Sequence, residues 1–223
     1  MIDVLNDPGG REKLLALGVR NVPVVSKGEA YVFGQNLEDV AEFVGLQGTG
    51  HKPLPPDQLI RKWIIALRAT QRYLRQIPGA RIHDNVIENR PRSIRLLGHH
   101  VFRIGEAFLE SATAGVEYSI GHANKPPADG TFTTGDELAR YGEEVIGRLQ
   151  AWWDAVPDKS LEWKTKTYYG MQPMKMVFER STWHSAQHAR QLIHVLERFG
   201  VEPDGRLTPA DLAGLPLPER LFE

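Results

Sequence analysis

The stretch that decides the fold runs from Pro173 to Gly200 and reads PMKMVFERSTWHSAQHARQLIHVLERFG. Its apolar residues recur at the three- and four-residue spacing of one helical face. Proline is favoured at the first helical position and glycine just after the last, so the pattern predicts a helix over about 173–199. The apolar stripe of this helix consists of Met174, Val177, Phe178, Leu192, Val195, Leu196 and Phe199.

Three further segments have the same helical periodicity. They cover about 57–76, 91–114 and 135–156, and each carries a stripe of aliphatic and aromatic residues. Four amphipathic helices of this length are what a four-helix bundle needs. The connections over 115–133 and 157–172 are long for a minimal up-and-down bundle, and long loops often carry function. The Pro-rich tail, 201–223, contains one expected short helix at 209–213.

Residues 1–46 have a different pattern. The run 2–5 is strand-like, a helix follows Asp7-Pro8 and ends at Gly18, a hairpin spans 22–34, and Asn36 caps a helix ending near Val44. A Gly/Pro-rich linker occupies 47–56. The sequence therefore predicts a mainly α protein: a small β-α-β-β-α segment over 1–46, a helical bundle over 57–200 and a tail over 201–223.

Composition excludes several classes of function. The 223 residues include no cysteine, which rules out disulfides, thiolate zinc sites and a cysteine nucleophile. The formal net charge of −1 gives no electrostatic case for nucleic acid or an anionic membrane. Neither a signal-peptide pattern nor a long apolar run is present, so we expect a cytoplasmic protein without a membrane segment.

Two histidines on the last long helix point to a metal. His184 and His188 are four residues apart, so they share one helical face. On a helical wheel His188 falls near the middle of the apolar stripe and His184 at its edge. A buried polar group without a partner costs about 1–3 kcal/mol, so something must satisfy both rings. Either a shared metal ion or hydrogen bonds to neighbouring helices would do so.

A second helix offers a third imidazole. His99 and His100 are adjacent on the segment 91–114, and the helical wheel turns His100 toward the bundle and His99 toward solvent. Three imidazoles leave open coordination positions, as in catalytic zinc sites. Imidazole also suits nickel, iron(II) and, less selectively, manganese.

These residues resemble the DinB-like superfamily, which includes bacillithiol transferases. The resemblance covers most of 57–199 and is carried by Ser93-Ile94-Arg95, His99-His100-Val101, Thr167-Tyr168-Tyr169-Gly170 and Trp183-His184 with His188 and Gln191. It implies a four-helix bundle in which His100, His184 and His188 hold a divalent metal, most simply zinc or nickel, with His99 as the alternative first ligand. It also implies chemistry that joins a low-molecular-weight thiol to an electrophile.

Further candidates surround this set. Gln191 and Glu106 are candidates for the groups that hydrogen-bond the ligand imidazoles, although a solvated surface position is the simpler interpretation of Glu106. Tyr168, Tyr169 and Met171 either wall the mouth of the site or pack over the end of the helices.

The amino-terminal segment resembles the second half of a glutaredoxin or thioredoxin fold. The resemblance is carried by Val22-Pro23, Gly28 and the run from Gly34 to Asp39. It implies a cis proline and a thiol-binding backbone at Val22 and Pro23, but without cysteine no thiol–disulfide chemistry is possible. The other interpretation is a vestigial docking element that covers part of the bundle or pairs between subunits. Because an uncovered edge strand promotes aggregation, we expect a second copy or the bundle to cap this edge, and we expect a homodimer.

The sequence thus predicts a metal-dependent enzyme that either transfers a glutathione-type thiol to a small electrophilic substrate or hydrolyses that substrate. Its expected partners are a small-molecule thiol or electrophile, not nucleic acid or membrane. The alternative is a non-catalytic metal-binding, dimerisation or stress-response module in which the histidines are only packed.

Overall fold

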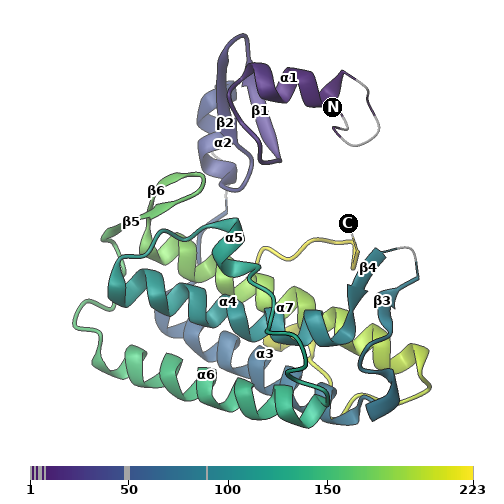
Figure 1. Ribbon diagram of the computed structural model, residues 1–223. Helices are drawn as coiled ribbons and strands as arrows, with labels where there is room; N and C mark the ends of the chain where they lie inside the picture. Colours follow the sequence, from purple (N-terminus) through teal and green to yellow (C-terminus); the bar gives the residue numbers. More distant parts are fainter. Residues whose placement is uncertain are drawn as a thin grey trace. The chain divides into compact units, whose positions relative to one another are not determined.

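A computed structural model describes residues 2, 4, 7, 9–47, 51–88 and 90–222. The chain divides into two compact units, Met1–Lys52 and Pro53–Glu223 (Figure 1). The boundary between the units lies inside the Gly/Pro-rich stretch 47–56.

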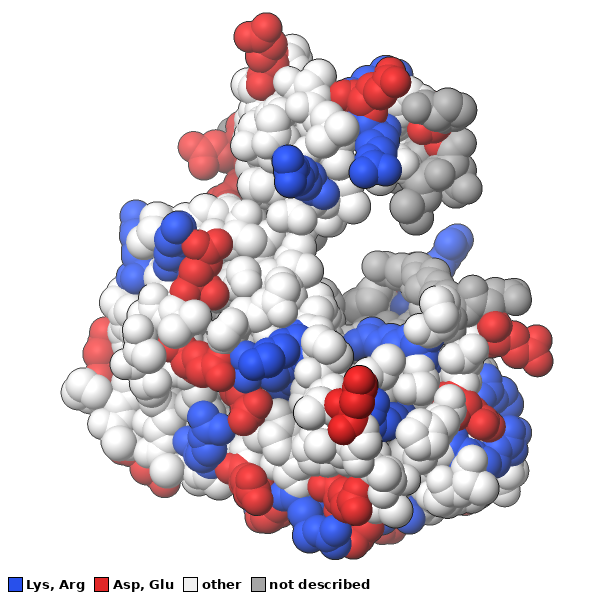
Figure 2. Space-filling model, in the orientation of Figure 1, with Lys and Arg blue, Asp and Glu red and all other residues white. Residues whose placement is uncertain are grey.

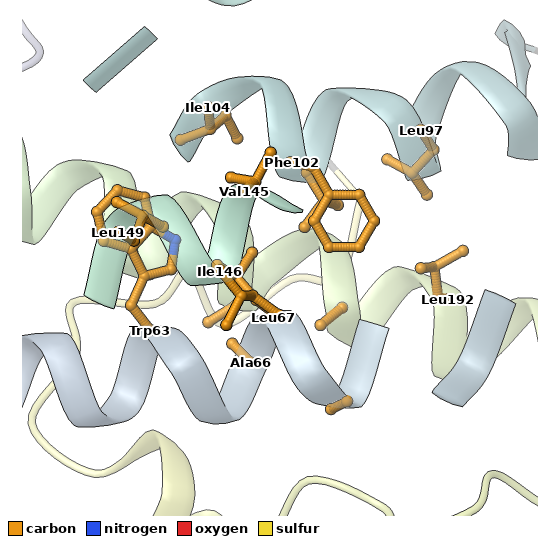
Figure 3. Close-up of a cluster of buried hydrophobic side chains, with 14 of the residues drawn as sticks. Trp63, Ala66, Leu67, Leu97, Phe102, Ile104, Val145, Ile146, Leu149 and Leu192 are labelled. Carbon is orange, nitrogen blue, oxygen red and sulfur yellow. The ribbon is translucent and has the colours of Figure 1, made fainter. Parts of the chain in front are cut away.

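The second unit is mainly helical. Its long helices are α3 (Pro56–Gln76), α4 (Ile94–Ala114), α6 (Gly135–Ala155) and α7 (Met174–Arg198). Helices α3 and α4 each pack against both α6 and α7. Figure 3 shows side chains from all four helices pointing into one core, among them Trp63, Leu67, Phe102, Val145 and Leu192.

Aromatic residues fill one part of this core. The Trp63 ring lies edge-on to Phe108 and Phe178, with centroid distances of 5.4 and 5.5 Å. The indole N–H of Trp63 donates to Ser185 Oγ at 3.0 Å, which satisfies its one polar group. This bond joins α3 to α7 one residue after His184.

Capping residues define where two of the long helices begin. The Ser93 hydroxyl accepts from the Leu96 N–H at the start of α4, and the Thr134 hydroxyl accepts from the Glu137 N–H at the start of α6. Helix α4 therefore begins at Ile94 and not near residue 91, because β4 (Arg90–Ser93) pairs with β3 (Asn85–Ile87). Pro173 is the N-cap of α7 and not its first residue, so this helix begins at Met174, one position later than predicted.

The long connections contain structure of their own. Residues 115–133 include the one-turn helix α5 (Ile120–Ala123), and 157–172 include strand β5 (Lys164–Thr167) and most of β6 (Gly170–Pro173), which pair antiparallel. The 3₁₀ helix η1 (Gly79–Arg81) follows α3. Tyr118 forms an isolated bridge with Thr167, which joins the two connections.

The tail after α7 packs back onto the helices. It contains α8 (Pro209–Leu212), within the predicted 209–213. Arg72 on α3 donates to the carbonyls of Asp204 and Gly205, and Gln187 on α7 donates to the carbonyl of Leu221. The tail is therefore part of the second unit.

The first unit holds α1 (Gly10–Ala16), β1 (Val24–Lys27), β2 (Ala30–Phe33) and α2 (Leu37–Val44). The predicted hairpin is confirmed, and Asn36 caps α2 as expected. The strand predicted over 2–5 falls largely outside the described residues, and Val4 lies in a turn. The Val22–Pro23 peptide bond is cis, and both residues are exposed.

Surface charge follows the near-neutral composition. On the face shown in Figure 2, Lys and Arg are interspersed with Asp and Glu. Among the described residues, no helix has both the length and the apolar character needed to cross a lipid bilayer.

Candidate metal centre

Three imidazoles from two helices converge inside the second unit. His100 comes from α4, and His184 and His188 from α7. One ring nitrogen from each lies within 4.8 Å of the others, a spacing that allows the three to hold one metal ion. The ring centroids are 5.2 Å apart for His100 and His184, 5.0 Å for His100 and His188, and 4.7 Å for His184 and His188. His100 and His188 are buried, and His184 is partly exposed.

Hydrogen bonds define the tautomer of His188. Its Nδ1 lies 2.8 Å from Gln191 Oε1, while Gln191 Nε2 donates to the Leu221 carbonyl at 2.9 Å. Because a carbonyl only accepts, the Gln191 amide must present its oxygen to the ring, and His188 Nδ1 carries the proton. Its Nε2 therefore keeps a lone pair.

His100 is held in the same way by a backbone group. Its Nδ1 lies 3.1 Å from the carbonyl oxygen of Ala123, on α5, so Nδ1 donates and Nε2 keeps its lone pair. A ligand imidazole in a protein normally donates its other N–H to an amide, carboxylate or carbonyl. His100 and His188 already have this arrangement.

One of these lone pairs has no partner. His188 Nε2 is buried and makes no hydrogen bond with any described residue. An unsatisfied buried polar atom costs about 1–3 kcal/mol, and buried polar groups in proteins are rarely left without a partner. A metal ion among the three rings would satisfy this atom, so the donor set fits a divalent cation that accepts imidazole nitrogen.

The rings are neutral and ready to coordinate. Burial, together with the positive charge of Arg92, lowers the pKa of His188 to about 3. Burial likewise holds the pKa values of His100 and His184 well below the usual range, reinforced by His188. Because a protonated imidazole cannot bind a metal, neutral rings at pH 7 are a precondition for the site.

His99 corrects one sequence expectation. The helical wheel turned it toward solvent, but it is only 8% exposed. Its ring stacks on Tyr141 at a centroid distance of 5.4 Å and lies against Phe132, and burial lowers its pKa to about 4. His99 thus packs between α4 and α6, and the α4 residue in the three-histidine cluster is His100.

Glu106 does not serve the ligand imidazoles. Its carboxylate accepts from Arg103, from Arg148 and from the Tyr141 hydroxyl, at 3.1, 2.9 and 2.6 Å. The partner of His100 is instead the Ala123 carbonyl. A backbone carbonyl in a connection has no residue-type signature, so sequence reasoning could not find it.

Of the residues expected near the mouth of the site, the two tyrosines make contacts within the second unit, whereas Met171 is exposed. Tyr169 is buried, and the Tyr168 hydroxyl accepts from Arg180 at 3.2 Å. Met171 is 57% exposed, so it is not packed over the end of the helices. Arg180 was not among the residues predicted from the sequence, although Arg180 stands one turn before His184 on the same face of α7.

Comparison with protein families, with curated proteins and with solved structures gave no match to this chain. The case for a metal centre therefore rests on the geometry of the three imidazoles and on the groups that hold them.

Proposed function

We propose that the protein is a divalent-metal enzyme of the DinB-like type that transfers a small-molecule thiol to an electrophile. The observation that carries the proposal is the orphaned lone pair of His188 Nε2, on one of three neighbouring neutral imidazoles. A core that only packed these rings would be expected to give this nitrogen a hydrogen-bond donor.

Each part of the site has a definite role in this proposal. His100, His184 and His188 would hold the ion, Gln191 and the Ala123 carbonyl orient two of the rings, and burial keeps the rings unprotonated. Three protein ligands leave coordination positions open for a small molecule. A bound divalent ion supplies a positive charge that lowers the pKa of a thiol, so the thiol is a nucleophile near neutral pH.

The proposed reaction joins the thiol sulfur to an electrophilic carbon. The leaving group departs with the bonding electron pair, and the thiol proton passes to solvent. Thiol is favoured over water as the nucleophile by the resemblance of residues 57–199 to thiol transferases. Hydrolysis uses the same open positions and is the competing outcome in the experiment below.

The test is a transfer assay on untagged, full-length protein loaded with zinc or nickel. Small thiols are paired with electrophiles such as a halo-dinitrobenzene and an epoxide, with and without chelator. We expect thiol adducts above the uncatalysed rate, and loss of that excess on chelation. Hydrolysed electrophile without adduct would assign water as the nucleophile.

A matched pair of variants separates the site from general effects of removing a histidine. His184→Ala removes a ligand and should reduce both metal content and transfer. His194→Ala removes a histidine ten positions along the same helix that packs on Phe222, and it should leave both unchanged. Metal-loaded protein that is inactive with every thiol and electrophile would favour the non-catalytic module.

A further inference from the structure

Two arginines near the three-histidine site lack acidic partners. Arg180 stands one turn before His184 on α7, and its guanidinium lies 5.5 Å from the ring centroid of Trp183. Arg92 is the last but one residue of β4, directly before the Ser93 cap of α4, and is half-buried. The positive charge of Arg92 contributes to lowering the pKa of each of the three imidazoles. No carboxylate of the described residues lies within ion-pair distance of either guanidinium.

Other arginines removed from water in this unit do have partners. Arg103 pairs with Glu106 and Glu110, and Arg190 donates to Gln187 Oε1 and to the Pro218 carbonyl. Arg92 makes no hydrogen bond or ion pair with any described residue, although burial of its guanidinium is sufficient to lower its pKa. A half-buried charge without a partner is costly, and the described residues supply no counter-ion, so a bound anion would stabilise Arg92.

The charge balance of the site leads to the same conclusion. Three neutral imidazoles leave the full charge of a divalent ion uncompensated, and Arg92 and Arg180 add two more positive charges. The groups that act most strongly on the three rings include no carboxylate. Such a site favours a ligand with more than one negative charge over a neutral molecule of the same shape.

We propose that Arg92 and Arg180 form an anion-binding edge of the three-histidine site, and that the ligand carries a carboxylate beside its metal-binding atom. This inference rests on the proposed function and names the chemical class of its thiol. A planar guanidinium can hold a carboxylate through two parallel N–H bonds, which fixes the ligand's orientation as well as its charge. Tyr168 and Trp183 hold Arg180 in place for this role.

The test compares two thiols that differ only in their charged end. Mercaptopropionate and mercaptopropanol are titrated into cobalt(II)-loaded, full-length protein, and binding is read from the thiolate-to-cobalt absorption band. We expect mercaptopropionate to bind about tenfold more tightly or better, since a hydrogen bond between a guanidinium and a carboxylate is about twice as strong as one between neutral groups. Arg92→Gln and Arg180→Gln should each reduce this preference, and the double variant should abolish it.

Arg61→Gln is the matched control, because Arg61 is exposed and pairs with Asp57 on the surface of α3. It should keep the full preference. Equal affinity for the two thiols in the wild-type protein, or a preference unchanged in both site variants, would overturn the anion-binding edge while leaving the metal site intact.

A sulfur-free probe separates this inference from the proposed function. Propionate is titrated by calorimetry into both the metal-free and the cobalt-loaded protein. Arginine-dependent propionate binding without thiol binding, or without cobalt uptake, would support the anion-binding edge and reject thiol transfer. If neither thiols nor propionate bind, the anion-binding edge is wrong.

Discussion

Gln191 decides which nitrogen of His188 is available to a metal. Its amide is fixed at both ends, by the Leu221 carbonyl and by the ring N–H. This arrangement keeps Nε2 as the lone-pair nitrogen and prevents the ring from rotating. The sequence suggested Gln191 because it stands one turn after His188 on α7, where a side chain can reach back to the ring.

Replacement of Gln191 should weaken metal binding without removing a ligand. In Gln191→Leu the His188 N–H loses its acceptor, so the ring is no longer held in one tautomer. Loss of such an orienting partner typically costs about 10–100-fold in metal affinity, and we expect a loss in that range by competition with a chromophoric chelator. Gln150→Leu, on the exposed side of α6, is the control. Equal affinities for the two variants would show that Gln191 has no orienting role.

The burial of His99 could not be predicted from its position on a helical wheel. The helical wheel assumes one buried stripe, but α4 packs against both α6 and α7 and is also contacted by α5. Most of its circumference is therefore buried, and the angle from the stripe no longer decides exposure. For α7, which keeps a more polar face, the same wheel correctly placed His188 in the interior and His184 at its edge.

At the scale of elements, α5 links a cluster of charged side chains to the three-histidine cluster. Arg103 is 6% exposed, holds Glu110 through two hydrogen bonds of 2.9 and 2.6 Å, and also donates to the His122 carbonyl at 3.1 Å. The neighbouring Ala123 carbonyl receives the His100 N–H. The position of α5, and with it the orientation of His100, therefore depends on this cluster.

The Glu110 carboxylate should make stability depend on pH. Its hydrogen bonds from Arg103 lower its pKa below the unfolded value, so it contributes stability above the unfolded pKa and loses that contribution as pH falls through the folded pKa. Between about pH 5 and pH 3, wild-type protein should lose more unfolding free energy in urea than Glu110→Gln does. Glu144→Gln, exposed on α6, should behave as wild type. Parallel curves for wild type and Glu110→Gln would contradict this role.

The close packing of α4 against α6 depends on Gly142, because glycine has no side chain. A Cβ on Gly142 would overlap the Phe102 ring, whereas a Cβ on Gly147, on the same helix, meets nothing within 4 Å. Gly142→Ala should therefore destabilise the fold by about 1–3 kcal/mol through overpacking. Gly147→Ala should stabilise it by about 0.5–1 kcal/mol, the usual gain over glycine inside a helix. Urea denaturation of both variants checks the pair, and equal effects would mean that α4 and α6 do not pack this closely.

The sequence specified the four long helices well, because their period and caps are local properties. It did not predict β3 with β4 or the one-turn α5, since short elements leave no periodic pattern and depend on the surface they pack on. Two of the three imidazoles followed from spacing on one helix. Orientation of the third depends on a carbonyl distant in sequence, which only the folded chain brings near.

At the scale of the whole molecule, the three-histidine cluster belongs entirely to the second unit. All three histidines, Gln191, Ala123 and the large apolar core lie within 53–223. Of the buried apolar side chains among the described residues, only Val19 and Ala41 belong to the first unit. The fragment 53–223 should therefore fold cooperatively and retain one metal ion per chain. Thermal unfolding and metal analysis of the fragment check this, and an aggregated fragment without metal would show that the first unit is required.

The most direct test of the central claim is the metal content of untagged, full-length protein, measured by elemental mass spectrometry beside His188→Ala and His194→Ala. We expect about one divalent ion per chain in the wild-type protein and in His194→Ala, and none in His188→Ala. Wild-type protein that takes up no metal, or His188→Ala that retains a full equivalent, would contradict a metal centre at these three imidazoles.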